Sequence, residues 1–161
     1  MRIGISLGGA MASADIGEQL AYVQEAEKLG VHSVWTVEGW GYDAVTPLAF
    51  IAGQTSRIKL GTSIMQICAR TPANIAMTAL SLANLSENRF LLGLGNSGPQ
   101  IVEGLHGVSF EKPLTRMRET VEIIRMALAG EKIDFSGVQH QLPLPGGQGR
   151  SLRLSEGPNL A

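Results

Sequence analysis

Residues 93–98 read Gly-Leu-Gly-Asn-Ser-Gly, the G-x-G-x-x-G spacing with which a chain turns tightly against a phosphate. An apolar run at residues 90–92 precedes the glycines, and residues 97–100 are predicted to open a helical turn. Backbone N–H groups at such a strand-to-helix turn point toward one place, and glycines let an anion approach them closely. The spacing indicates a nucleotide-like cofactor, while a tight turn that binds no ligand is the plainer interpretation.

The elements that must position this turn alternate between strands and helices. Four strands are predicted, at residues 3–7, 33–37, 58–64 and 89–94. Four helices are predicted, at residues 15–29, from Thr46–Pro47 to about 54, from Thr71–Pro72 to about 85, and at 114–128, the two Thr-Pro pairs supplying an N-cap and a first-turn proline. A small hairpin with its turn at Ser136–Gly137 is predicted within residues 133–142.

This alternation predicts an α/β fold with a parallel sheet and helices outside it. Four βα units form either half of an eight-fold βα barrel or a small, open, doubly wound sheet. The chain has 161 residues, and a whole barrel usually takes about 250. A whole barrel is therefore excluded.

The amino-acid composition excludes some classes of binding partner. The 13 basic and 14 acidic residues are nearly balanced, which argues against nucleic acid or a membrane surface as a partner. Cys68 is the only cysteine, so no internal disulfide is expected, and we expect it to be a small buried hydrophobe. The sequence shows neither a signal-peptide layout nor a transmembrane run, and we predict a soluble, cytoplasmic protein without a metal site.

The position of the glycine turn argues against a nicotinamide dinucleotide. A dinucleotide-binding domain places this turn after its first strand, whereas here it follows the fourth. The acidic residue that would bind the ribose should lie about 20 residues further on, at the end of a strand. Glu119 has that spacing but falls inside the predicted helix 114–128. Two interpretations of the glycine turn remain: a phosphate-binding turn of another kind, and a tight turn that binds no ligand.

Several segments of the sequence together resemble the luciferase-like monooxygenase family, in particular its deazaflavin (coenzyme F420) dependent oxidoreductases. They occur in register with the βα pattern at Val34–Asp43, Leu60–Gln66, Ala69–Pro72, Leu85–Phe90, Leu92–Gln100, Val102–Gly107 and Lys112–Pro113. The resemblance covers about residues 1–145 and implies the first half of a luciferase-like TIM (βα)8 barrel. We therefore expect one truncated barrel domain at residues 1–145, an irregular tail at 146–161, and a chain that is the amino-terminal part of an oxidoreductase.

The resemblance also implies where a cofactor is bound. Relatives support the cofactor ring on a bulge with a non-proline cis peptide, which corresponds here to Ser63–Ile64. Gln66 would face the polar edge of the cofactor. Asn96, Ser97 and the following glycine, Gly98, match the region that contacts the cofactor side chain and its phosphate. Coenzyme F420 is the expected cofactor, with FMN as the alternative.

The catalytic residues are not assigned by the resemblance. Glu38 follows the second strand, where relatives often carry an acidic residue and then a histidine, but Gly39 replaces that histidine. His106 follows the glycine turn and is the other candidate. Trp40 and Tyr42 are expected near the opening of the substrate site.

In relatives the reaction belongs to the cofactor, and the implied function is hydride transfer between F420 and an unknown small organic substrate. One alternative is an FMN-dependent monooxygenase that uses molecular oxygen. Another is a non-catalytic half-barrel that needs a partner chain or pairs with a second copy as a homodimer, because a half-barrel leaves strand edges unpaired.

Overall fold

The computed structural model describes residues 1–155, which fall into two compact units. The first unit holds residues 1–65 and 81–95. The second unit holds residues 66–80 and the described residues from 96 onward. No helix in the described part of the chain is long and apolar enough to cross a membrane.

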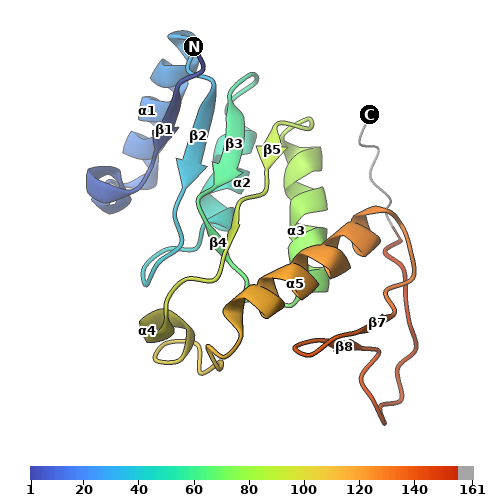
Figure 1. Cartoon of the computed structure of the whole chain (residues 1–161). Coiled ribbons are helices and arrows are strands. Elements are labelled where there is room, and N and C mark those ends of the chain that lie inside the picture. Colours follow the sequence, from blue (N-terminus) through green and yellow to red (C-terminus); the bar gives the residue numbers. More distant parts are fainter. Residues whose placement is uncertain (156–161) are drawn as a thin grey trace. The chain divides into compact units, whose positions relative to one another are not determined.

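Four parallel strands form the sheet of the first unit (Figure 1). They lie side by side in the order β1 (Gly4–Ser6), β2 (Ser33–Thr36), β3 (Lys59–Thr62) and β5 (Phe90–Leu91). Val34 pairs with Ile5 on one side and Leu60 on the other. Each strand thus lies next to the one that follows it in the sequence, and the prediction of parallel βα units is confirmed.

Helices cover one face of this sheet. α1 (Ile16–Lys28), α2 (Val45–Ala52) and the last turn of α3 (Pro72–Leu85) follow the first three strands, and a short 3-10 helix spans Gly9–Ser13. The core between helices and sheet consists of fully or almost fully buried side chains, namely Leu7, Val23, Val34, Leu48, Ile51, Ala52, Ile58, Leu60 and Leu82. Burial of these aliphatic groups is what holds the helices on the strands.

A single aromatic ring covers much of the other face. Side chains alternate along a strand, so Trp35 points away from the face that carries Val34. A Cβ added to Gly61 would overlap the Trp35 ring, and one added to Gly4 would lie 3.1 Å from its Nε1. Nε1 donates a hydrogen bond to Ser33 Oγ at 3.0 Å. The ring therefore lies across β1 and β3, and both glycines leave room for it.

α1 begins as predicted and α2 does not. Asp15 caps α1 by accepting a hydrogen bond from Glu18 N at 2.9 Å. The predicted cap at Thr46–Pro47 is wrong, because α2 already starts at Val45. Asp43 Oδ1 accepts hydrogen bonds from Val45 N and Thr46 N, both at 2.7 Å. A carboxylate satisfies these free N–H groups and suits the positive end of the helix, so it takes the place of the threonine hydroxyl.

The third and fourth predicted strands are shorter than expected. β3 ends at Thr62, and residues 89–94 are not one strand but β5 and then β6 (Leu94–Gly95). β6 pairs with β4 (Met65–Gln66) in a separate ladder. The change of partner occurs at Gly93, whose N–H donates to Thr62 Oγ1 at 3.0 Å while its carbonyl accepts from the same hydroxyl at 2.8 Å. A side-chain hydroxyl therefore replaces the ladder hydrogen bonds at that point.

The second unit contains the first turns of α3, then α4 (Pro99–Val102), α5 (Pro113–Leu128) and a hairpin of β7 (Phe135–Ser136) and β8 (Gln141–Leu142). Thr71 caps α3 as predicted, since its Oγ1 accepts from Asn74 N at 3.3 Å. No helix or strand occurs in residues 146–155. The rest of the predicted tail, 156–161, lies outside the described residues.

The hairpin is confirmed, but its turn lies at residues 137–140 and not at Ser136–Gly137. Glu119 of α5 decides this, because its carboxylate accepts hydrogen bonds from Val138, Gln139 and His140 N at 2.7–2.9 Å. Burial raises the pKa of Glu119, but the three N–H bonds and the His140 ring together bring it below its ordinary value. The predicted turn missed a partner that lies 19 to 21 residues away in sequence.

Candidate functional site

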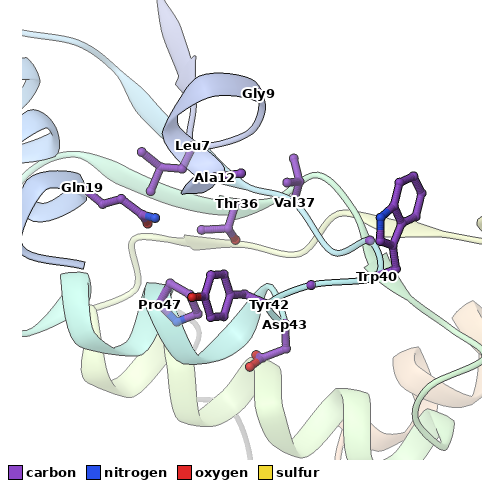
Figure 2. Close-up of a pocket in the computed structure, with 12 residues that line it drawn as sticks. Leu7, Gly9, Ala12, Gln19, Thr36, Val37, Trp40, Tyr42, Asp43 and Pro47 are labelled. Atoms are coloured by element: carbon purple, nitrogen blue, oxygen red, sulfur yellow. The ribbon is translucent and has the colours of Figure 1, made fainter. Parts of the chain in front are cut away.

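A cleft of about 490 Å³ lies in the first unit, at the end of the sheet where β1 and β2 finish (Figure 2). It is lined by Leu7, Gly9, Ala12, Gln19, Thr36, Val37, Gly39, Trp40, Gly41, Tyr42, Asp43 and Pro47. We call this space the strand-end cleft. Its volume suits a small organic molecule, and the carboxyl ends of parallel strands are the usual place for such a site in α/β folds.

The polar side chains of the strand-end cleft are bonded to the backbone around it. Gln19 Nε2 donates to the carbonyls of Met11 and Ala14, each at 3.0 Å. Thr36 Oγ1 donates to the Ala44 carbonyl at 2.7 Å. Both side chains are buried. They hold the loops that form the wall of the cleft, and the rest of the lining is largely apolar.

Two aromatic side chains stand at the opening of this cleft. Trp40 is 83% exposed and Tyr42 is 75% exposed, and both come from the loop between β2 and α2. Aromatic side chains that are this exposed bury little surface on folding, so they contribute little to the stability of the fold. Both rings line the cleft and are largely exposed, and their place at the opening of a substrate site stays a prediction.

A second cleft of about 510 Å³ shares part of this lining. Gln19, Tyr42, Asp43 and Pro47 line both spaces. The second space, here the helix-start cleft, is completed by residues near the starts of α1 and α2, namely Ala14, Asp15, Ile16, Thr46 and Phe50. Tyr42, Asp43 and Pro47, which are drawn in Figure 2, thus belong to the lining of both spaces.

The predicted ring support at Ser63–Ile64 lies next to the strand-end cleft. The peptide bond between these residues is cis, as the resemblance led us to expect. Ser63 N donates to the carbonyl of Thr36, a lining residue, at 2.7 Å. Ser63 is exposed and Ile64 is half-buried. This end of β3 is thus joined to the wall of the cleft by one backbone hydrogen bond, although neither Ser63 nor Ile64 lines the cleft.

Close packing explains the first two glycines of the G-x-G-x-x-G string at residues 93–98. A Cβ on Gly93 would overlap the Thr62 carbonyl oxygen, and one on Gly95 would lie 2.5 Å from Ile64 Cγ1. Close packing of the chain on the end of β3 thus requires glycine at both places. A Cβ on Gly98 would meet nothing, and the left-handed residue of the turn is Ser97, with φ of 57°. The spacing alone is therefore no evidence for a phosphate.

The remaining predicted cofactor residues belong to the second unit. Gln66 is fully buried, and its Oε1 accepts from the Cys68 thiol at 3.6 Å. Asn96 is half-buried beside a small hollow, and Ser97 is exposed. Gly98 precedes α4 as its N-cap residue. Asn96, Ser97 and Gly98 leave an accessible turn, and their contact with a cofactor stays a prediction.

The two candidate catalytic residues differ in their surroundings. Glu38 is half-buried in the first unit, where its Oε1 accepts from Ala44 N at 3.3 Å and so supports the loop that carries Trp40 and Tyr42. His106 is exposed in the second unit. No group of three or more potential metal-binding side chains occurs among the residues that the structure describes.

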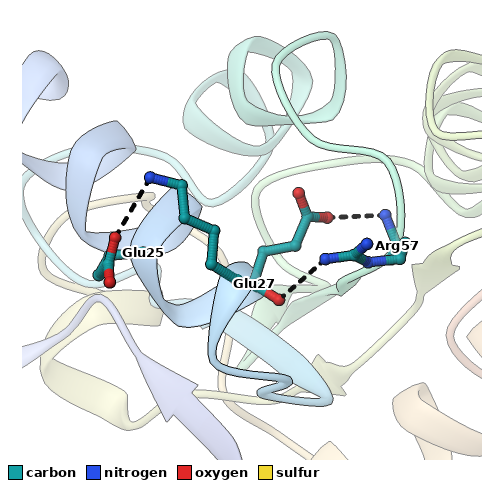
Figure 3. A network of polar contacts seen from close by, with 4 residues as sticks. Glu25, Glu27 and Arg57 are labelled. Carbon is teal, nitrogen blue, oxygen red and sulfur yellow. Dashed lines mark hydrogen bonds and ion pairs between the residues drawn. The ribbon is translucent and has the colours of Figure 1, made fainter.

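The opposite end of the sheet is held by two charged side chains. Arg89 is buried and donates to the carbonyls of Ala52, Thr55 and Ile58 at 2.9 Å, and to the Thr55 hydroxyl at 3.0 Å. Glu27 accepts from the N–H groups of Ser56, Arg57 and Ile58 at 2.7–3.0 Å, and Arg57 donates to its backbone carbonyl (Figure 3). Together they fix the end of α2 and the entry to β3.

The pKa of Glu27 reflects these contacts. Burial raises the pKa, whereas the three backbone N–H bonds and the charge of Arg57 lower it by more, so that it lies below its ordinary value. Sequence reasoning did not find Glu27, Arg89 or the helix-capping role of Asp43. Only Asp43 carries a local signal, namely an acidic residue just before an apolar helical stretch.

Parallel βα units with a cleft at the carboxyl ends of the strands define an α/β protein built like part of a barrel enzyme. The model of the luciferase-like monooxygenase family matches residues 1–155, and the chain belongs to that family. A Mycobacterium tuberculosis protein that carries the name of a coenzyme F420-dependent oxidoreductase is 44% identical over 160 residues, which is 95% of this chain and 45% of that protein.

Solved structures agree with this assignment. The monooxygenase RslO1 from Streptomyces bottropensis has a TM-score of 0.78 and 30% identity, over 88% of this chain and 47% of that one. The oxygenating constituent of a diketocamphane monooxygenase from Pseudomonas putida, solved with FMN, has a TM-score of 0.78 at 19% identity, over 88% and 43%. The predicted half-barrel fold is confirmed. The chain spans about half the length of the curated relatives it matches.

Proposed function

We propose that the chain belongs to an oxidoreductase that transfers a hydride between coenzyme F420 and a small organic substrate. The observation that carries this proposal is the strand-end cleft of about 490 Å³, which lies beside the exposed end of β3 at Ser63–Ile64. The relative named for F420 dependence is 44% identical over nearly the whole chain, which favours F420 over FMN.

Several residues of the chain would act together with the bound cofactor. When bound, the deazaflavin supplies a carbon that accepts or gives up the hydride. Ser63 and Ile64 would support its ring. A phosphate role for Asn96, Ser97 and Gly98, which belong to the second unit, is a separate prediction that rests on the N–H groups of that turn. Glu38 keeps the loop that begins α2 in place through its bond to Ala44 N. The strand-end cleft holds the substrate and limits the access of water.

Titration of the purified chain with oxidised F420, and with FMN in parallel, tests the proposal. We expect saturable F420 binding, followed through the visible absorbance of the deazaflavin, and weaker binding of FMN. Asn96→Asp places a carboxylate beside the proposed phosphate and should weaken F420 binding by about tenfold, which corresponds to about 1.4 kcal/mol. Asn84→Asp is the matched control, since Asn84 is an exposed side chain of α3, and it should bind F420 normally.

A folded chain that binds neither cofactor would contradict the proposal and favour the non-catalytic half-barrel. Tighter binding of FMN than of F420 would favour the flavin monooxygenase instead. Equal F420 affinity in the Asn96→Asp variant and the unmodified chain would remove the phosphate role from the turn at residues 96–98.

A further inference from the structure

We infer that the strand-end cleft and the helix-start cleft together take an uncharged, largely apolar substrate, and that they reject anionic ones. This inference rests on the proposed function, because it makes these two clefts the substrate side of that site. It goes further by naming the chemical class of the substrate from the charges and the burial of the lining residues.

The lining of the two clefts offers an anion no positively charged partner. None of the residues that line either cleft, all within the described part of the chain, is a lysine, arginine or histidine. The charged side chains of the two linings are Asp43 in both clefts and Asp15 in the helix-start cleft. A carboxylate or phosphate that enters would lose water without gaining a cation and would meet two carboxylates.

The two carboxylates are themselves engaged with helix starts. Asp15 accepts from Glu18 N at 2.9 Å, and Asp43 accepts from Val45 N and Thr46 N at 2.7 Å. The positive ends of α1 and α2 are thereby already compensated, so they do not attract a ligand anion. The charged parts of the cofactor are excluded from these clefts by the same argument, which leaves the space to the substrate.

Exposed apolar side chains continue from one cleft into the other. Tyr42 lines both spaces, and beyond it Ile16 is 44% exposed and Phe50 is 46% exposed in the helix-start cleft. A ring in the strand-end cleft can therefore extend an apolar substituent past Tyr42 onto Ile16 and Phe50. Removal of these surfaces from water supplies the binding energy, at about 25 cal/mol per Å².

A matched pair of probes tests this inference without any cofactor. Naphthalenemethanol and naphthoate have the same ring system and differ in charge, and calorimetric titration of the full chain measures their affinities. We expect the neutral alcohol to bind at least about tenfold more tightly, a difference of about 1.4 kcal/mol. Equal affinities, or tighter binding of naphthoate, would overturn the inference.

A cation placed in the lining should reverse this preference. Gly39 lines the strand-end cleft, and a Cβ added there meets no atom within 4 Å. We expect Gly39→Lys to raise naphthoate affinity by about tenfold or more. Gly149→Lys is the matched control, because a Cβ on Gly149 also meets open space and that residue lies in the second unit. A gain in both variants would show unspecific attraction and overturn the inference.

Removal of the aromatic side chains of the strand-end cleft tests whether the probe binds there. Trp40→Ala and Tyr42→Ala should each weaken binding of the alcohol several-fold, whereas Leu144→Ala, at a side chain that is 73% exposed in the second unit, should not. Concentration-dependent dimerisation that Tyr42→Ala abolishes would instead assign these rings to a second copy and refute the inference. F420 binding without alcohol binding would refute this inference alone, and alcohol binding without F420 binding would refute only the proposed cofactor.

Discussion

The two ends of the first unit's sheet are built differently. At the amino-terminal end, buried Arg89 and half-buried Glu27 bind backbone groups 29 to 37 residues away in sequence. Around the strand-end cleft, at the other end, Gln19, Thr36 and Asp43 bind chiefly to backbone no more than eight residues away. The side chains at the amino-terminal end tie distant parts of the chain together, whereas Gln19, Thr36 and Asp43 around the cleft mainly shape local loops.

Because of this difference, we expect the amino-terminal end of the sheet to contribute mainly to stability and the carboxyl end mainly to binding. Long-range bonds at the amino-terminal end close large loops and so carry the fold, whereas loops at the carboxyl end can vary without releasing the sheet. The same division is general among βα barrels. Substitutions at the two ends should therefore have separate consequences, which unfolding and binding measurements can distinguish.

The largest effect is expected at Arg89. Arg89→Leu removes four hydrogen bonds from a buried cation and leaves the carbonyls at the end of α2 without a partner, so we expect a loss of about 3 kcal/mol in the free energy of unfolding. Urea unfolding measures this loss. Arg89→Lys should recover only part of it, because lysine cannot reach the same spread of acceptors. A loss below about 1 kcal/mol would show that this end does not carry the fold.

Gly93 should show the next largest effect, although it lies at the carboxyl end. The Cβ of Gly93→Ala overlaps the Thr62 carbonyl oxygen, and we expect about 2 kcal/mol of destabilisation from the resulting strain. Gly98→Ala meets open space and should stay within about 0.5 kcal/mol of the unmodified chain. Equal losses at the two glycines would contradict the explanation that packing against Thr62 requires the first glycine and leaves Gly98 unconstrained.

Glu27 should contribute less, and its contribution should depend on pH. Glu27→Gln weakens three hydrogen bonds on a half-buried carboxylate, so we expect a loss of about 1 kcal/mol at neutral pH. The folded chain holds the pKa of Glu27 below its ordinary value. The contribution is therefore complete above about pH 4.5, the ordinary value, and disappears as the pH falls through the lowered pKa.

Urea unfolding curves of the Glu27→Gln variant and of the unmodified chain, at neutral and at acidic pH, measure this pH dependence. Glu25→Gln is the matched control, because Glu25 forms only an exposed pair with Lys28 at 3.3 Å and should change stability little. A difference between Glu27→Gln and the unmodified chain that stays constant down to strongly acidic pH would contradict the assignment.

The smallest effect on stability is expected at the cleft. Trp40→Ala and Tyr42→Ala should leave the free energy of unfolding within about 0.5 kcal/mol, because both rings are at least three-quarters exposed. The same variants should lose binding of the neutral probe. A stability loss above about 1 kcal/mol would show that the rings belong to the fold, and the comparison of the two ends would fail.

The βα order, the hairpin and the family could be predicted because they follow from local patterns and motifs. Capping of α3 by Thr71 is an example, since cap and helix are adjacent. Contacts between distant residues could not be predicted in this way: Thr62 divided the fourth strand at Gly93, and Glu119 moved the hairpin turn. Asp43 displaced Thr46 as the cap of α2 although it is only three residues away, because either side chain could satisfy the free N–H groups of that helix. In each case a side chain satisfied backbone groups for which the local pattern had indicated another partner.

The candidate site was predictable to a different degree. The motifs led to Ser63–Ile64 and to the loop of Trp40 and Tyr42, and the structure places both at the carboxyl end of the sheet. The two clefts could not be predicted, because they depend on how Gln19 and Asp43 hold the loops near the starts of α1 and α2. The roles of all the predicted site residues stay predictions, namely those of Ser63, Ile64, Gln66, Asn96, Ser97, Gly98, Glu38 and His106.

The two tryptophans give the molecule two distinct optical reporters. Trp35 lies across the middle of the sheet between Gly4 and Gly61, whereas Trp40 stands in water at the opening of the strand-end cleft. Indole emission shifts to the blue as water is excluded from around the ring, so half-buried Trp35 should emit at shorter wavelength than exposed Trp40. Fluorescence of the unmodified chain therefore follows unfolding of the sheet in its blue component and occupation of the cleft in its red one.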